Sequence, residues 1–196
     1  MTLTSHSPLH VLDAQSLVIG GVEPITPHRW YGRLATGVLL AGDGPGVPWT
    51  HVKAGLRERR GLVDAVVFGG DEPTRQSALA DAMAQARELG YLVGLLTRGG
   101  LPRSLADVLS LADWVGIEVG AAGAHDVSVW TSLELIMRSG LEYEVTISVD
   151  PSRHTREDVR ATAREVIRRG AHAPVLCGRR LYDVIHPEDL PDLERR

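Results

Sequence analysis

The chain has 196 residues, a formal net charge of −4 and a single cysteine. The length suits one domain with a sizeable core, and the charge favours neither a nucleic-acid backbone nor an anionic membrane as partner. One cysteine excludes an internal disulfide and a multi-cysteine metal site within this chain. No signal-peptide pattern and no bilayer-spanning apolar run is present, so we expect a cytoplasmic protein.

Apolar runs alternate with helical patterns along most of the chain. Residues 1–16 are predicted to be a loose leader, and a partly apolar segment follows at 17–25. The predicted strands cover residues 34–40, 63–68, 91–96, 114–119, 143–149 and 173–177. The helical patterns between them cover residues 50–60, 74–89, 102–112, 129–139 and 155–169. Strands separated by helices are parallel, so the sequence predicts an α/β fold with six parallel strands.

The same pattern predicts a division into three parts. Residues 1–32 are a leader with a short extension, residues 33–180 form the α/β domain, and residues 181–196 form a tail. Six strand–helix units fit either an open doubly wound sheet or an incomplete barrel, and periodicity does not choose between them. No Gly-x-Gly-x-x-Gly follows the first of these strands, which disfavours a dinucleotide-binding fold.

Chemistry in α/β folds is placed at the carboxyl ends of the strands. The loop after the first predicted strand reads Asp43-Gly-Pro-Gly-Val-Pro-Trp-Thr50 and holds one obvious chemical group, Asp43. Carboxylates near a histidine can perform acid–base work or hold a divalent ion; the alternative is that these groups cap helices and face solvent. The polar strand-end residues are Asp43, Glu72, Glu118, His125, Asp126, Ser148, Asp150 and Arg179, and the catalytic candidates among them are Glu72, Glu118, His125 and Asp126.

Several separated motifs agree with one known family. They are residues 32–36 (Gly-Arg-Leu-Ala-Thr), 66–76 (Val-Val-Phe-Gly-Gly-Asp-Glu-Pro-Thr-Arg-Gln), 97–99 (Thr-Arg-Gly), 113–118 (Asp-Trp-Val-Gly-Ile-Glu), 132–135 (Ser-Leu-Glu-Leu), 139–140 (Ser-Gly) and 143–145 (Tyr-Glu-Val). In order and spacing they resemble the radical S-adenosylmethionine (SAM) superfamily, specifically the small activating proteins of anaerobic ribonucleotide reductase. The resemblance covers residues 19–180 and implies a partial, TIM-like (β/α)6 barrel.

The resemblance also implies a four-iron cluster, held by a Cys-x-x-x-Cys-x-x-Cys motif in the loop after the first strand. Aligned without a gap, those three positions are Asp43, Val47 and Thr50. Soft thiolate ligands hold such clusters, and the only cysteine, Cys177, lies at the end of the last predicted strand, where it cannot replace three ligands. We therefore expect that the metal site is lost and that the radical chemistry is lost with it.

The family's Gly-Gly-Glu motif, which holds the methionine end of SAM, reads Gly70-Asp71-Glu72 here. A side chain thus replaces the second glycine, where backbone close to a ligand favours glycine. The remnant of the SAM pocket implied by the resemblance consists of Gly70, Asp71, Glu72, Thr97, Gly99, Glu118 and Ser148. From these departures we expect no cofactor, with no iron–sulfur cluster and with SAM binding weak or lost.

Three hypotheses remain open. The first is a pseudoenzyme that acts as a binding or regulatory partner of a protein or small molecule, without nucleic acid or membrane. The second is an enzyme with a repurposed carboxylate and histidine pocket, with or without a metal. The third is a working ribonucleotide reductase activating protein with its cluster held in another way.

Overall fold

The computed structural model describes residues 13–42, 44, 46–121, 126–150 and 152–177. Its centre is a seven-stranded sheet in the order β1 to β7, in which β1 is antiparallel to β2 and every other pairing is parallel. No pairing among the described residues joins β7 back to β1, so the sheet is open. The strands are β1 (Ile19–Thr26), β2 (Ala35–Leu40), β3 (Ala65–Gly70), β4 (Leu92–Thr97), β5 (Trp114–Gly120), β6 (Glu142–Ser148) and β7 (Val175–Cys177).

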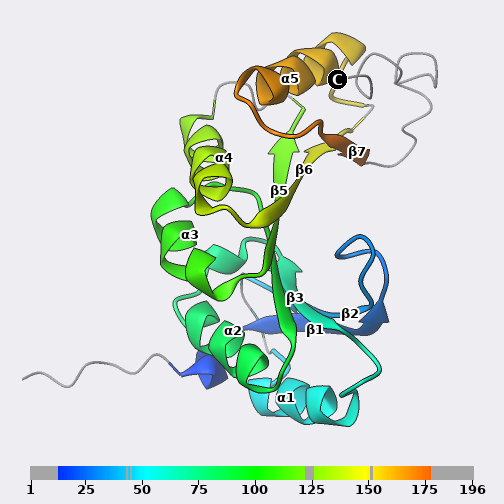
Figure 1. The fold of residues 1–196 in the computed structure, drawn as a ribbon, viewed down its shortest axis with the longest axis vertical. Coiled ribbons are helices and arrows are strands. Elements are labelled where there is room, and N and C mark those ends of the chain that lie inside the picture. Colours follow the sequence, from blue (N-terminus) through cyan, green and yellow to red (C-terminus); the bar gives the residue numbers. More distant parts are fainter. Residues whose placement is uncertain (1–12, 43, 45, 122–125, 151, 178–196) are drawn as a thin grey trace, which may run out of the picture.

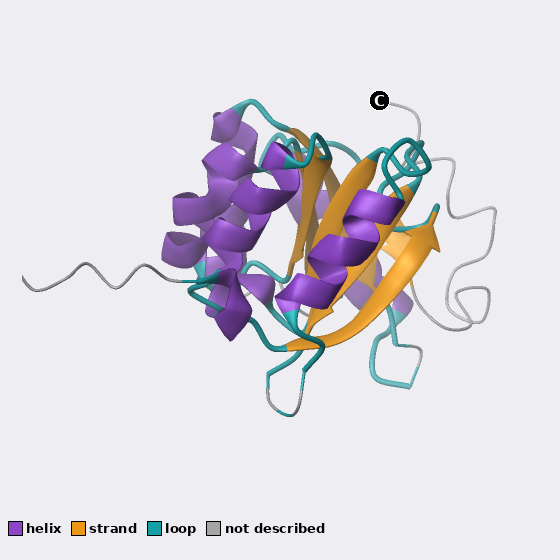
Figure 2. Cartoon of the chain, turned by 90° about the horizontal axis from the view of Figure 1, so that it is seen from below, coloured by secondary structure: helices purple, strands orange, loops and turns teal. Residues whose placement is uncertain are grey.

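In the part of the chain that the structure describes, five α-helices and three short 3-10 helices precede or connect these strands. They are η1 (Ala14–Ser16), α1 (Trp49–Glu58), η2 (Pro73–Arg75), α2 (Leu79–Glu88), α3 (Pro102–Val108), η3 (Leu109–Leu111), α4 (Val127–Ser139) and α5 (Arg156–Arg168). Helices α2, α3 and α4 follow one another along one side of the sheet (Figure 1). The view from below shows the strands beside this helical layer (Figure 2). None of the helices in the described part of the chain is long and apolar enough to cross a membrane.

All six predicted strands are present, and residues 19–26 add a seventh. The sequence placed these residues in an N-terminal extension, because Gly20, Gly21 and Pro24 interrupt the apolar pattern of a strand. In the structure β1 pairs with β2 through register shifts that accommodate this irregular segment. The proposed division into three parts remains a prediction, but residues 19–26 lie within the sheet.

One predicted helix, residues 74–89, is divided in two. The turn η2 ends at Arg75, and α2 begins at Leu79. Between them the backbone of Gln76 is extended, with φ −91° and ψ 114°. Its side-chain amide donates hydrogen bonds to Val18 O at 3.1 Å and Ala41 O at 3.0 Å and accepts one from Val18 N at 2.8 Å. The Gln76 side chain therefore bonds backbone groups of Val18 and Ala41, which lie next to strands β1 and β2. These tertiary hydrogen bonds override the local helical propensity.

The two faces of the sheet carry different clusters of buried side chains. On β3, Val66 and Phe68 belong to the large core packed against the helices, whereas Ala65 and Val67 belong to a separate cluster. Strand side chains alternate between faces, so we call the face that carries Ala65 and Val67 the inner face. The strand-end pocket described below lies on this inner face.

A stack of two tryptophans fills part of the inner face. Trp30, from the β1–β2 connection, lies on Trp114 of β5 with 5.3 Å between ring centroids and 14° between planes. Both side chains are 3% exposed. The stack fits because Gly94 offers no side chain beneath it; a Cβ there would lie 3.2 Å from each indole. The Arg33 guanidinium lies 5.9 Å from the Trp30 ring centroid, close enough for a cation–π contact.

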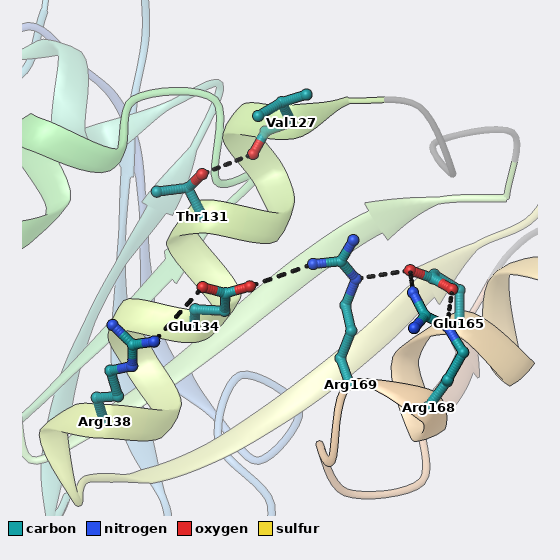
Figure 3. Close-up of polar contacts among 7 residues, drawn as sticks. All are labelled: Val127, Thr131, Glu134, Arg138, Glu165, Arg168 and Arg169. Atoms are coloured by element: carbon teal, nitrogen blue, oxygen red, sulfur yellow. Dashed lines mark hydrogen bonds and ion pairs between the residues drawn. The ribbon is translucent and has the colours of Figure 1, made fainter.

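Ion pairs connect α4 to the C-terminal end of α5 (Figure 3). Arg169 Nη1 lies 3.2 Å from Glu134 Oε1, and Arg169 Nε lies 2.7 Å from Glu165 Oε1. The Arg169 guanidinium also lies 4.7 Å from the centroid of the Trp130 ring. Glu165 also forms an ion pair with Arg168, whose Nη2 lies 2.6 Å from Glu165 Oε1. Arg169 thus holds the end of α5 against α4.

Candidate functional site

A hollow of about 430 Å³ opens on the inner face at the carboxyl ends of the parallel strands. This volume lies within the range of about 300–1,000 Å³ that small-molecule sites occupy. Its walls come from β3 to β7 and from the β1–β2 connection. The lining residues are His28, Arg29, Gly70, Asp71, Leu96, Thr97, Arg98, Gly116, Ile117, Glu118, Glu144, Thr146, Val175 and Cys177. We call this hollow the strand-end pocket.

Gly70 and Asp71 form the edge of the strand-end pocket at the end of β3. Gly70 has φ 112°, and a Cβ there would collide with the backbone of Leu40 on the neighbouring strand. No residue with a side chain fits at this position without strain. Asp71 N donates a hydrogen bond of 3.0 Å to Leu40 O, so the backbone that carries the Asp71 side chain is fixed to β2.

The Asp71 carboxylate pairs across the pocket edge with Arg98, the first residue after β4. Asp71 Oδ1 lies 3.1 Å from Arg98 Nη1, and the two side chains are 50% and 59% exposed. Asp71 also lines a second, smaller hollow of about 250 Å³, on the side of Ser16 and Gln76. The ion pair therefore lies between two openings.

Glu72 is buried, with 8% exposure, and its carboxylate is fully engaged by neighbouring residues. Oε1 accepts hydrogen bonds from Thr74 N at 3.2 Å, Thr74 Oγ1 at 2.6 Å and Thr97 Oγ1 at 2.9 Å. Oε2 accepts hydrogen bonds from Arg98 N at 2.9 Å and from the shared Thr97 hydroxyl at 3.1 Å. Glu72 thus joins the end of β3 to the end of β4 and lies in the wall of the smaller hollow rather than in the strand-end pocket.

Thr97 and Gly99 shape the turn that follows β4. Thr97 Oγ1 accepts a hydrogen bond of 2.9 Å from Gly99 N while donating to Glu72. Gly99 has φ 72°, and a Cβ there would lie 2.9 Å from Ile117 and 3.2 Å from Ser132. Its carbonyl accepts a 2.7 Å hydrogen bond from Ser132 Oγ on α4. Thr97 lines the strand-end pocket, whereas Gly99 packs against α4 beside it.

The opposite wall of the pocket is acidic. Glu118 of β5 and Glu144 of β6 both line it, and Thr146 Oγ1 donates a 3.3 Å hydrogen bond to Glu144 Oε1. Cys177, at the end of β7, is half-buried and lies close enough to both carboxylates for their charges to act on its thiol. Burial raises the pKa of the Cys177 thiol, and the charges of Glu118 and then Glu144 raise it further. The thiol is therefore held protonated and is a poor nucleophile or metal ligand at neutral pH.

The charged lining is negative overall. Three carboxylates (Asp71, Glu118 and Glu144) face two guanidinium groups (Arg29 and Arg98). Arg29 is already neutralised by Glu23 of β1, which it contacts at 2.6 Å and 2.8 Å. The hydrogen bonds from Arg29 lower the pKa of Glu23, so this pair stays charged at neutral pH.

The remaining sequence candidates lie away from the pocket lining. Asp126 caps α4, where its Oδ1 accepts a 2.9 Å hydrogen bond from Ser128 N. Ser148 ends β6 in register with Gly120 and Cys177. Asp150 accepts hydrogen bonds from the Ser152 hydroxyl and backbone N–H, which lower its pKa. Asp43, His125 and Arg179 lie outside the described residues.

The loop before α1 does not offer the donor set of a thiolate-held cluster at its described positions. Val47 packs against the core, and its N–H donates a 2.8 Å hydrogen bond to Ile19 O. Thr50 is exposed on the first turn of α1. Within the described parts of the chain, no group of three or more His, Cys, Asp or Glu side chains is arranged to hold a metal ion.

Sequence reasoning did not select Arg98, Glu144 or Thr146, which line the pocket. A signal for Glu144 and Thr146 was present, because polar residues alternate along residues 142–148 while Val145 and Ile147 are buried. Such alternation marks one face of a strand as solvent-accessible. Arg98 lies in a motif that the resemblance uses, but its sequence position does not show where its side chain points.

No protein-family model matches the chain. Over 85 residues the chain is 34% identical to 7-carboxy-7-deazaguanine synthase of Thermococcus kodakarensis. These residues make up 43% of this chain and 34% of that protein. The structure of Streptococcus suis SuiB bound to SAM is similar to this chain with a TM-score of 0.54 at 14% sequence identity. The similarity covers 70% of this chain and 35% of the SuiB chain. Archaeal TYW1 matches 86% of this chain and 71% of its own with a TM-score of 0.53 at 10% identity. The chain thus spans about a third of the length of the first two relatives.

These comparisons support a radical SAM fold, in agreement with the predicted partial barrel, here an open sheet. The narrower resemblance to ribonucleotide reductase activating proteins remains a prediction. The expectation of no cofactor is contradicted, because the proteins that this chain resembles are radical SAM enzymes and one SuiB structure holds SAM. That expectation rested on departures at a few positions, Asp43, Val47, Thr50 and Asp71, whereas the likeness to these proteins extends over much of the chain.

Proposed function

We propose that this chain is a non-radical pseudoenzyme of the radical SAM fold, a binding or regulatory protein that holds SAM intact in the strand-end pocket. One observation carries the proposal: the pocket at the strand ends is open and negatively lined, while Val47 and Thr50 place no thiol in the loop before α1. Retained binding beside a loop that lacks thiols fits a protein that recognises SAM without cleaving it. A protein partner for such a regulator remains a prediction.

The charge of the pocket supports SAM as its ligand. SAM carries a positively charged sulfonium, and the acidic wall of Glu118 and Glu144 offers it two carboxylates. Opposite charges in a partly desolvated pocket attract more strongly than in bulk water. S-adenosylhomocysteine, which has a neutral thioether at the same atom, gains nothing from this wall. The proposal therefore predicts that SAM binds more tightly than S-adenosylhomocysteine.

Isothermal titration of the purified chain with both compounds tests this function. We expect a SAM affinity in the micromolar range, about −8 kcal/mol, and a severalfold weaker S-adenosylhomocysteine affinity. Thr146→Phe should fill the pocket from β6 and weaken both ligands at least tenfold. Thr131→Phe, the same substitution at an exposed position of α4 (Figure 3), should leave binding unchanged. No binding of SAM, or equal effects of the two substitutions, would contradict the proposal.

A further inference from the structure

We infer that the face formed by the C-terminal ends of α4 and α5 docks an acidic segment of a protein partner. This rests on the part of the proposed function that expects a protein partner, but it concerns residues that do not line the strand-end pocket. Arginines from both helices surround a hollow of about 440 Å³ on this face (Figure 3). We call this face the arginine surface, and it consists of Met137, Arg138, Arg164, Ile167, Arg168 and Arg169.

Most of the guanidinium groups on the arginine surface are accessible. The side chains of Arg138, Arg164 and Arg168 are 80%, 68% and 69% exposed. That of Arg169 is 25% exposed, because it lies between the two helices. A partner that approaches this face therefore meets charge from α4 and from α5 at once.

The arginines of α5 form a row of the length of a short peptide. Residues four apart on a helix are neighbours on its surface, and exposed arginines recur at this interval at positions 156, 160, 164 and 168. At 1.5 Å per residue the row is about 18 Å long. An extended segment of roughly six residues has the same length, at about 3.3 Å per residue.

The ion pairs within the arginine surface leave charge and donors for a partner. Arg138 Nη2 lies 3.8 Å from Glu134 Oε2, which is longer than a hydrogen bond. Arg168 bonds Glu165 through Nε and Nη2 at 2.7 and 2.6 Å, and its Nη1 has no acceptor among the described residues. On α4 and residues 156–169, arginines outnumber carboxylates by six to four, although the whole chain has a net charge of −4.

Arg169 holds the two helices in a fixed relation. Its Nη1 lies 3.2 Å from Glu134 and its Nε lies 2.7 Å from Glu165, while its guanidinium lies over the ring of Trp130. The accessible arginines of α4 and α5 are therefore presented at a set spacing. Groups presented in this way lose less conformational freedom on binding. Arg169 is thus a positioning residue.

A short acidic peptide suits this surface better than a nucleic acid. The net charge of −4 opposes a long polyanion, whereas a short segment responds to charges within about 8 Å. Single-stranded nucleic acids also stack on aromatic side chains, and α5 contains none. Ile167, which is 39% exposed, and Met137 offer apolar contacts to a peptide that mixes acidic and apolar residues.

Fluorescence anisotropy with labelled peptides tests the inference. The probe is a short peptide that alternates glutamate and leucine, and its control carries glutamine in place of glutamate. We expect the acidic probe to bind at least tenfold more tightly than the control peptide, and added salt to weaken it. Arg138→Glu should weaken the acidic probe at least fivefold. Arg57→Glu makes the same charge change at an exposed position in the last turn of α1 and should change it less than twofold.

Three results would overturn the inference: no binding of the acidic probe, equal losses in the two variants, or tighter binding of oligothymidylate than of the acidic probe. A dimer of the chain that Arg138→Glu dissociates in analytical ultracentrifugation would assign the surface to a second copy and would also overturn it.

Titration of SAM into the same two variants separates failure of this inference from failure of the proposed function. Neither Arg138 nor Arg57 lines the strand-end pocket, so both variants should bind SAM as the unchanged protein does. SAM binding without binding of the acidic probe would overturn the inference alone. Binding of the acidic probe that depends on Arg138, without binding of SAM, would support the inference and contradict the SAM site of the proposed function.

Discussion

Replacing Glu72 by alanine should destabilise the fold by about 2–6 kcal/mol. The carboxylate accepts hydrogen bonds from four donors: two hydroxyls and two backbone N–H groups. The hydroxyls of Thr74 and Thr97 can rotate toward other acceptors, but the N–H groups of Thr74 and Arg98 cannot. Each backbone donor left without a partner costs about 1–3 kcal/mol, so the pair costs roughly 2–6 kcal/mol.

Urea unfolding with linear extrapolation measures this loss. Thr97→Val removes one of the four donors and should cost about 1 kcal/mol. Glu58→Ala, at the exposed end of α1, serves as the control and should lie within about 0.5 kcal/mol of the unchanged protein. A loss below about 1 kcal/mol for Glu72→Ala would refute the view that this carboxylate joins β3 to β4, and would free it for a ligand.

Three further predictions address other parts of the molecule. Trp30→Ala should cost about 3–5 kcal/mol in urea unfolding, because it empties the buried inner-face stack; a loss near zero would mean that the stack does not stabilise the sheet. Since the pKa of Cys177 is raised, disulfide exchange with a chromogenic reagent at pH 8 should be slower than for a free thiol, and Glu118→Gln should accelerate it. The pKa of Glu165 is lowered from 4.5 to about 2, chiefly by its hydrogen bonds with Arg168. The associated stability is present above pH 4.5 and is lost as pH falls toward 2, so Glu165→Gln should flatten acid unfolding across that window, and an unchanged profile would contradict the assignment.

The strand pattern was the part of the fold that the sequence predicted well. Strands such as residues 65–70 are apolar almost throughout, which is typical of a parallel sheet buried on both faces. The sequence did not predict the strand at residues 19–26, because its glycines and proline interrupt the apolar pattern of a strand. Pairing with β2 stabilises this strand in the structure. The sequence also did not predict the break at Gln76 in the helix expected at residues 74–89. The hydrogen-bond partners of Gln76, Val18 and Ala41, are distant in sequence.

The strand ends could be located from the sequence, but the directions of their side chains could not. The motif at residues 70–72 correctly marks the strand ends, yet neighbouring side chains point to different places. Asp71 faces the pocket, whereas Glu72 is buried among donors from Thr74, Thr97 and Arg98. Gly70, which precedes them, has φ 112°, and the sequence does not specify where the side chains that follow it point.

Recovery of SAM after exposure to a strong one-electron reductant tests the central claim most directly. The protein is incubated without oxygen with SAM and the reductant, and mass spectrometry then measures SAM, methionine and 5′-deoxyadenosine. The account predicts that SAM remains bound and is recovered intact. Formation of 5′-deoxyadenosine and methionine in excess over protein would contradict it and would show that the chain still performs radical chemistry.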